Sequence, residues 1–171
     1  MVLRRLRRNR SNTRTPMKVE VFTICDYAQA DPTGKLHIIG VFDRIFGNIA
    51  PATHLTCCIV ARLRFDSIEV GLKAITIRFI NADGASVMPE LRQQFQVQVP
   101  PPEQSSTTNL ILLIQQLVLP SFGDYSIDLA VDGRLEASYQ LSYRQAVLPP
   151  TPPSPPPLSE LPPPPGLLPE D

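Results

Sequence analysis

The 171-residue chain has no tryptophan, three cysteines and few aromatic residues, 6% of the total. The cysteines, Cys25, Cys57 and Cys58, are odd in number and lack the spacing of a zinc site, so neither a disulfide framework nor a structural metal is expected. They favour a reduced, cytoplasmic chain. No run approaches the roughly 18 apolar residues of a membrane-spanning helix. Phosphate-binding loops, nucleophile elbows and metalloprotease motifs are absent, so the sequence predicts no catalytic, cofactor-binding or metal site.

Charge and proline divide the chain into three parts. The first sixteen residues carry six arginines and no acidic residue: Arg4, Arg5, Arg7, Arg8, Arg10 and Arg14. Residues 149–171 hold twelve of the twenty prolines, a composition that cannot pack a core. We therefore expect a basic disordered arm at 1–16, one folded domain at 17–148 and a proline-rich disordered tail at 149–171. The middle part is long enough to bury about two-thirds of its surface.

Alternation of apolar and polar residues, typical of strands with one buried face, recurs through the middle part. It is longest over 55–65, where six residues are expected to point inward: Leu55, Cys57, Ile59, Ala61, Leu63 and Phe65. Further strands are expected at 17–25, 35–42, 72–82, 93–99, 122–131 and 135–144. A loop through Gly47, Asn48 and Pro51 should follow 35–42.

Residues 109–119 are ambiguous, because Leu110, Leu113, Ile114 and Leu117 also fit one face of a helix. We expect a strand here, since the segment is short and lies between a threonine cluster and Pro120. The total is then about seven or eight strands with no helix, which predicts an all-β, antiparallel, immunoglobulin-like β-sandwich. Tyr125, which follows Gly123 near the start of its strand, resembles the corner tyrosine of such sandwiches, whose hydroxyl bonds a nearby backbone group.

Residues 122–144 predict a β-hairpin. Asp132-Gly133 favours a two-residue turn, but that turn would put the apolar residues of the two strands on opposite faces. We therefore expect a three-residue loop over 131–133, which pairs Leu129 with Leu135 on one face. The remaining apolar pairs in this register are Ile127 with Ala137 and Tyr125 with Tyr139.

This register has one unfavourable pair, Asp128 opposite Glu136. Two like charges directly across a ladder cost a few tenths of a kcal/mol. Burial of a large apolar side chain contributes about 1.5–3 kcal/mol. The apolar pairs are therefore expected to decide the register.

Five stretches of the middle part resemble a small family of uncharacterised bacterial proteins, known as a domain of unknown function. They cover about residues 17–143 and are, in order, MKVEVFTICDYA, GKLHIIGVFDRI, CCIVARLRF, NLILLIQQL and GDYSIDLAVDGRLEA. The resemblance implies a single β-sandwich domain and no activity, because none is established for the family. Neither the arm nor the tail belongs to it.

Cys25 and Cys57 with His37 or His54 have the chemistry of a cysteine–histidine pair or of part of a zinc site. Such a pair needs an orienting partner and an oxyanion donor, which the spacing does not supply. We interpret the cysteines as small core residues and the histidines as ordinary edge or loop residues.

Acidic residues gather in the expected turns, and strand order sorts them to two ends of the sandwich. Asp31, Asp66, Glu69 and Asp132 should lie at one end, and Asp43, Asp83 and Asp124 at the other. Three convergent carboxylates could bind calcium. Turns, however, also favour aspartate for its backbone hydrogen bonds, and no dense Asp-x-Asp loop is present. Asp26 and the pair Asp43-Arg44, which flank expected strand ends, are interpreted as a salt bridge or a cap.

The sequence thus predicts a non-enzymatic protein-binding or scaffolding module whose sheet edge or loop ends meet another protein. The alternative is a calcium-dependent ligand binder or a small enzyme that uses the acidic loop ends. Nucleic acid is not expected as a partner, except through the arginine arm, because no basic stripe interleaved with aromatics accompanies that arm. Residues 153–156 match Pro-x-x-Pro but lack a basic anchor, so the tail is interpreted as a spacer.

Overall fold

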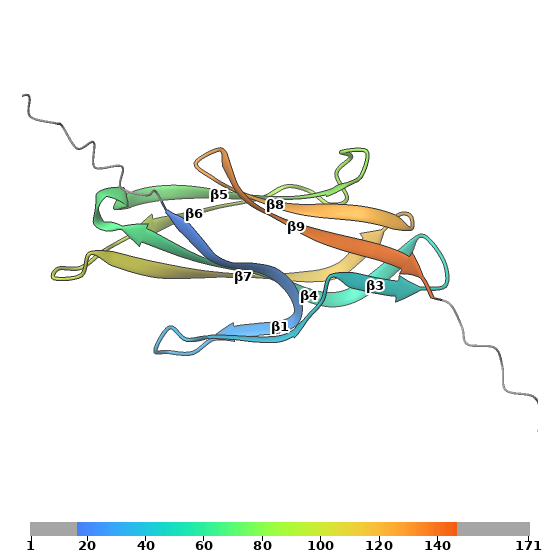
Figure 1. Cartoon of the computed structure of the whole chain (residues 1–171), viewed down its shortest axis with the longest axis horizontal. Coiled ribbons are helices and arrows are strands. Elements are labelled where there is room, and N and C mark those ends of the chain that lie inside the picture. Colours follow the sequence, from blue (N-terminus) through green and yellow to red (C-terminus); the bar gives the residue numbers. More distant parts are fainter. Residues whose placement is uncertain (1–16, 147–171) are drawn as a thin grey trace, which may run out of the picture.

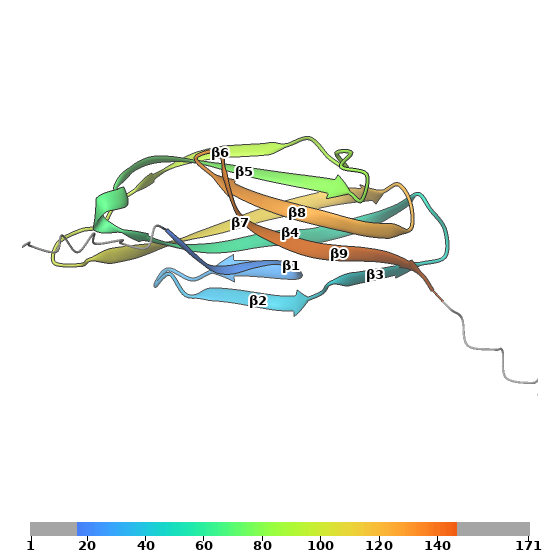
Figure 2. The same ribbon diagram turned by 45° about the horizontal axis from the view of Figure 1, so that its top comes forward.

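A computed structural model describes residues 17–146, so our expectations for the arm and the tail lie outside the described residues. Within this range the chain forms two facing β-sheets and one turn of 3-10 helix, η1 (Ser67–Glu69) (Figures 1 and 2). The strands are β1 (Lys18–Ala30), β2 (Leu36–Val41), β3 (Arg44–Gly47), β4 (Ala52–Asp66), β5 (Gly71–Asn81), β6 (Leu91–Val97), β7 (Ser105–Leu119), β8 (Gly123–Val131) and β9 (Arg134–Gln145). No helix of this range is long and apolar enough to cross a membrane.

The strand order is that of an immunoglobulin-like sandwich. One sheet has the order β2-β1-β4-β7 and the other β3-β9-β8-β5-β6. All neighbours are antiparallel except β3 and β9, which are parallel. The order β1-β4-β7 facing β9-β8-β5-β6 corresponds to strands A-B-E facing G-F-C-C′ of immunoglobulin domains. The predicted fold class is therefore confirmed, and the ambiguous segment at 109–119 belongs to the long strand β7.

Tyr125 forms the expected corner. Its buried ring lies near the start of β8 and contacts the ring of Phe79 edge-on, with centroids 5.8 Å apart. The hydroxyl donates a hydrogen bond to the carbonyl oxygen of Ser121 (2.5 Å) and accepts one from the N–H of the same residue (3.2 Å). The side chain thus fixes the chain as it passes from β7 into β8.

The β8–β9 turn corrects our expected register. Asp132 and Gly133 both have positive φ, 49° and 81°, and form the two-residue turn that we rejected, with Val131 opposite Arg134. Alternation is restored by a β-bulge: Ala130 pairs with Leu135 but Leu129 pairs with Ala137, so that Glu136 is the extra residue. The turn preference and the apolar alternation are both obeyed.

The bulge changes every pair that we expected on this face. Ile127 lies opposite Tyr139 and Tyr125 opposite Leu141, while Leu135 is exposed. The expected like-charge pair does not form, because Asp128 lies opposite Ser138 and accepts a 2.7 Å hydrogen bond from its hydroxyl.

The main core lies between the sheets and includes the inward residues of β4 from Cys57 to Phe65. Leu55, which we expected to point inward, is 74% exposed. The alternation shifts by one residue here, so that Leu55 and Thr56 both face solvent. β7 shifts at the matching position, where Gln116 has a φ of 55°, and the ladder between the two strands keeps its register.

β1 is bent, and its two halves have different partners. Lys18–Cys25 pairs with β4 and Cys25–Ala30 pairs with β2. Beyond the bend the β1–β2 hairpin lies over the outer face of the sheet, on the side away from β8 and β9 (Figures 1 and 2). It covers a second apolar cluster that consists of Cys25, Ala28, Cys58 and Val60, with Leu36, Ile38 and Ile111 packed against it. β4 is therefore buried on both faces along part of its length.

Gly40 is needed at this bend. It has a φ of 69° and lies between the pairs Cys25–Val41 and Tyr27–Ile39, and a Cβ added to it would overlap the Asp26 carboxylate. Asp26 is thus inside β1, not at a strand end as we expected.

β3 replaces part of the loop that we expected through Gly47. It pairs in parallel with residues 142–145 of β9 and extends the second sheet at its edge. A four-residue strand has too few positions to show alternation, and its partner is distant in sequence. The amino-acid pattern therefore shows neither the strand β3 nor its pairing with β9.

Candidate interaction surface

The acidic residues at one end of the sandwich are held by their own neighbours. Glu69 accepts a hydrogen bond from the N–H of Asp66 (3.0 Å). Asp132 accepts one from the N–H of Ala74 (2.9 Å) and pairs with Lys73 (3.1 Å). The Ala74 amide first, and then Lys73, lowers the pKa of Asp132. Glu69 and Asp132 line one cavity of about 230 Å³, with Lys73 beside them.

Asp31 closes the turn of the β1–β2 hairpin. One of its carboxylate oxygens accepts hydrogen bonds from the Thr33 hydroxyl (2.7 Å), the Thr33 N–H (2.8 Å) and the Lys35 N–H (3.0 Å). The Thr33 hydroxyl contributes most to lowering the pKa of Asp31. The other oxygen lies 3.6 Å from His37. This carboxylate is therefore used to hold its own turn.

At the opposite end the carboxylates are also engaged locally. Asp124 accepts hydrogen bonds from the Ser142 hydroxyl (2.8 Å) and from Arg144 (2.5 Å), and the Ser142 contact is the main cause of its lowered pKa. Asp43 pairs with its neighbour Arg44 at 3.9 Å, which confirms the expected ion pair.

The predicted sorting to two ends agrees with the strand pairing, but the carboxylates do not converge. Asp83 lies in the turn after β5, at the end where Asn81 pairs with Tyr125, and its N–H donates to the Asn81 side chain (3.1 Å). Residues 17–146 contain no group of three or more His, Cys, Asp or Glu side chains that could hold a metal ion. The calcium alternative therefore has no candidate site in this range.

Calcium is accordingly expected to leave the thermal unfolding midpoint unchanged. An ion that binds only the folded chain would raise the midpoint as its concentration increases. Differential scanning calorimetry with calcium, and with magnesium as the control ion, measures this directly. A rise that follows calcium but not magnesium would support the alternative.

The cysteines and histidines do not form a reactive pair. Cys57 lies in the main core and Cys58 in the second cluster, on opposite faces of β4 as expected. Burial raises the pKa of the Cys57 thiol to about 12, so it remains protonated and a weak nucleophile at neutral pH. The Cys25 thiol donates to the Cys58 carbonyl (3.7 Å). Among residues 17–146 no hydrogen bond joins a cysteine to His37 or His54.

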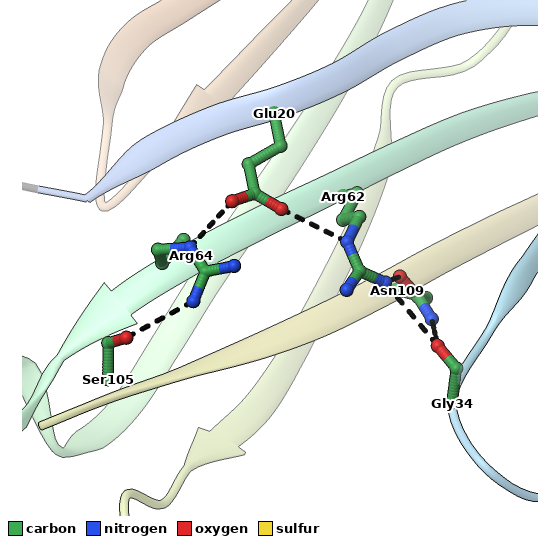
Figure 3. A network of polar contacts seen from close by, with 6 residues as sticks. All are labelled: Glu20, Gly34, Arg62, Arg64, Ser105 and Asn109. Atoms are coloured by element: carbon green, nitrogen blue, oxygen red, sulfur yellow. Dashed lines mark hydrogen bonds and ion pairs between the residues drawn. The ribbon is translucent and has the colours of Figure 1, made fainter. Parts of the chain in front are cut away.

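A polar network ties the β1–β2 hairpin to the sheet beneath it (Figure 3). Glu20 of β1 accepts hydrogen bonds from Arg62 (3.0 Å) and Arg64 (2.5 Å), both on β4. Arg62 also donates to the side chain of Asn109 (2.9 Å) and to the carbonyl oxygen of Gly34 in the hairpin turn (3.4 Å). Asn109, on β7, donates to the same carbonyl (3.0 Å). One carboxylate and two guanidinium groups therefore connect three strands and the hairpin.

Acid should weaken this network. The hydrogen bond from Arg64, more than that from Arg62, lowers the pKa of Glu20 below its ordinary 4.5. The unfolded chain binds the proton more tightly, so the stabilisation is fully present above pH 4.5 and is lost as pH falls through the lowered pKa.

Glu20→Gln is expected to reduce the free energy of unfolding at neutral pH and to make it fall less steeply in acid. Urea unfolding at several pH values tests this, with Glu103→Gln as the control. Parallel pH profiles for Glu20→Gln and the parent would contradict it.

β7 is the least protected edge of the sandwich. The strands that end the two sheets are β2, β3, β6 and β7. β3 is four residues long with Arg44, β2 six with His37, and β6 seven with Arg92. β7 has fifteen residues, without an ionisable side chain or a proline. Within residues 17–146 its backbone hydrogen bonds go to β4 alone, which leaves the peptide groups of the opposite side unpaired.

Apolar side chains lie beside this free backbone. Leu113 of β7 is 58% exposed on the outer face of the sheet, and Val118 of β7 is also exposed. Folded proteins usually guard an edge with a lysine, a proline or a very short strand. β7 has none of these. We call Ser105–Leu119, with its unpaired side, the β7 edge.

The sequence pattern located this strand but not its exposure. A strand without charge is also typical of the centre of a sheet. Strand order, which decides between centre and edge, depends on contacts between distant segments. The signal that was available is the run of fifteen residues without charge, more than twice the length of any other edge strand.

Residues 20–144 match the model of a family of unknown function (DUF6941), which confirms the resemblance to an uncharacterised domain. No curated protein matches the chain. Among solved structures, an alkylpurine DNA glycosylase of Pseudomonas fluorescens bound to DNA with an abasic site analog is 10% identical, covers 75% of this chain and 30% of its own, and has a TM-score of 0.40. An immunoglobulin-like protein of Pseudomonas aeruginosa is 10% identical, covers 77% of this chain and 99% of its own, and has a TM-score of 0.30. Likenesses this weak do not bear on what the chain binds.

Proposed function

The chain belongs to the DUF6941 family of unknown function, and we propose that it is a non-enzymatic binding module that takes up an extended polypeptide segment at the β7 edge. The observation that carries this proposal is the edge itself: fifteen residues with a free backbone side and no charge to repel a neighbour. Strand addition at such an edge is a common mode of peptide recognition.

A binding role fits the chemistry of the remaining side chains better than catalysis does. The carboxylates at the loop ends accept hydrogen bonds from nearby backbone or side-chain donors. Lowered pKa values keep Asp31, Asp124 and Asp132 ionised at neutral pH, which is unsuited to a general acid. The Cys57 thiol is buried and protonated.

Strand addition also says what the bound segment should look like. Main-chain hydrogen bonds provide affinity, and every second side chain of the segment lies on the outer face beside Leu113. An uncharged segment with apolar residues at alternate positions fits this surface best. A charged residue beside Leu113 would be desolvated without a partner.

Leu113→Lys should abolish such binding. Lysine on an edge strand keeps its charge in water only while no strand lies beside it, so it opposes addition without disturbing the core. The matched control is Leu135→Lys, because Leu135 is 59% exposed in the other sheet and Leu113 is 58% exposed. Peptides selected from a display library against the full chain should bind the control and fail to bind Leu113→Lys.

Hydrogen exchange gives the second measurement. Amides of β7 that point away from β4 should exchange quickly in the monomeric chain and slowly with a selected peptide bound. Peptides that bind Leu113→Lys as well as the parent, or that protect other strands, would contradict the proposed site. A library that yields no binder against the monomeric chain would contradict the proposed function.

A further inference from the structure

We propose that the segment bound at the β7 edge is the β7 edge of a second copy of this chain, in an antiparallel two-fold pairing centred on Leu112. This inference rests on the proposed function and identifies the polypeptide segment that the β7 edge binds. The paired sheets would form one continuous sheet of eight strands, with the two β7 strands at its centre.

The first observation is that β7 is complementary to itself. A two-fold interface brings the same surface together twice, so each residue must suit its symmetry mate. A two-fold axis through Leu112 places each residue of Asn109–Gln115, NLILLIQ, opposite a residue of the same kind, so that apolar side chains face apolar ones and amides face amides. Leu110 meets Ile114, Ile111 meets Leu113, and Asn109 meets Gln115. These cross-strand pairs are favourable ones.

The second observation is the match of faces. On the outer face, Asn109 donates to the hairpin turn and Ile111 packs in the second cluster, while Leu110 and Ile114 lie in the main core. Antiparallel pairing about Leu112 keeps outer residues opposite outer residues. The exposed Leu113 of each copy would then lie beside Ile111 of the other, which removes apolar surface from water.

The third observation concerns charge. Because β7 contains no ionisable residue, a two-fold axis through it brings no like charges into opposition. β3 and β6 would each carry an arginine into a symmetric pairing, and β2 is shorter and already part of the hairpin. Length, pattern and charge all favour β7 as the self-pairing edge.

Leu113→Cys tests the geometry. The three native cysteines are buried, with 0–2% exposure, so a cysteine at 113 would be the accessible thiol. In the proposed register the two copies of residue 113 are diagonal neighbours across the ladder, about 7–8 Å apart. A short bis-maleimide should therefore link most of the full-length Leu113→Cys protein into a covalent dimer. Leu135→Cys, equally exposed in the other sheet, should remain monomeric.

Sedimentation velocity of the unmodified chain provides the independent readout. The parent and Leu135→Lys should sediment as dimers, and Leu113→Lys as a monomer with an unchanged circular dichroism spectrum. A monomeric parent would overturn this inference but would leave the proposed function standing if library peptides still bind at β7. A dimer that persists in Leu113→Lys, or that cross-links through residue 135 and not 113, would also overturn it.

Discussion

Leu129→Asp should destabilise the protein severely. Leu129 has no exposed surface and lies in β8 between Ile77 of β5 and Ala137 of β9. A carboxylate there would lose its hydration without gaining a cation or a hydrogen-bond donor. We expect a cost of about 4 kcal/mol or more, a large part of the roughly 5–15 kcal/mol that stabilises an ordinary domain. Urea unfolding followed by far-ultraviolet circular dichroism measures it.

Leu135→Asp is the matched control, because Leu135 lies on the neighbouring strand and is 59% exposed. It should change the free energy of unfolding by no more than about 0.5 kcal/mol. Equal losses in the two variants would contradict the inward assignment of Leu129. The comparison also tests the bulge, since the three-residue loop would have placed both leucines on the buried face.

Gly47→Ala should have the second largest effect. Gly47 ends β3, and a Cβ added there would overlap the hydroxyl of Tyr143 on β9. That ring cannot move aside easily, since it is buried, stacks on Phe122 at 4.7 Å and donates a hydrogen bond to the Ile49 carbonyl (2.5 Å). Overpacking and loss of this hydrogen bond together predict a cost of about 2–4 kcal/mol. Chemical denaturation with fluorescence or circular dichroism gives the value.

Tyr143→Phe separates the two contributions. It removes the hydroxyl that the alanine would meet, so Gly47→Ala should cost clearly less in the Tyr143→Phe background than in the parent. Some cost should remain, because the ring carbons nearest the added Cβ lie only 3.0 Å away. Additive effects would show that the hydroxyl does not restrict residue 47.

The β8–β9 hairpin shows how far local pattern determines structure. Asp132-Gly133 favours a two-residue turn, whereas the apolar alternation requires the buried residues of both strands to lie on one face. In a regular ladder these two requirements conflict. The chain satisfies both by inserting Glu136 as a bulge. This bulge is at Glu136 and has no glycine to mark it, so the compromise could not be read from the sequence, although both constraints could.

The bent β1 strand shows a second limit. The sequence pattern correctly predicted a strand over residues 17–25, but the strand continues to Ala30 with a different partner. The burial of Cys58 and Val60 was not predicted. These side chains are covered by a hairpin that folds over the outer face, and this contact joins segments far apart in sequence. The candidate site shows the same limit. The sequence pattern predicted a strand at residues 109–119, but it did not predict that one side of this strand would be unpaired.

The parallel pair of β3 and β9 has a consequence for how the chain is made. On the ribosome, β3 emerges early, yet residues 44–47 have no ladder to join until 142–145 have been synthesised. Nascent chains that stop before β9 therefore leave one sheet open, with β8 as an additional bare edge. Completion of the sandwich has to follow synthesis of its last strand, and until then the unpaired strands leave apolar surface exposed.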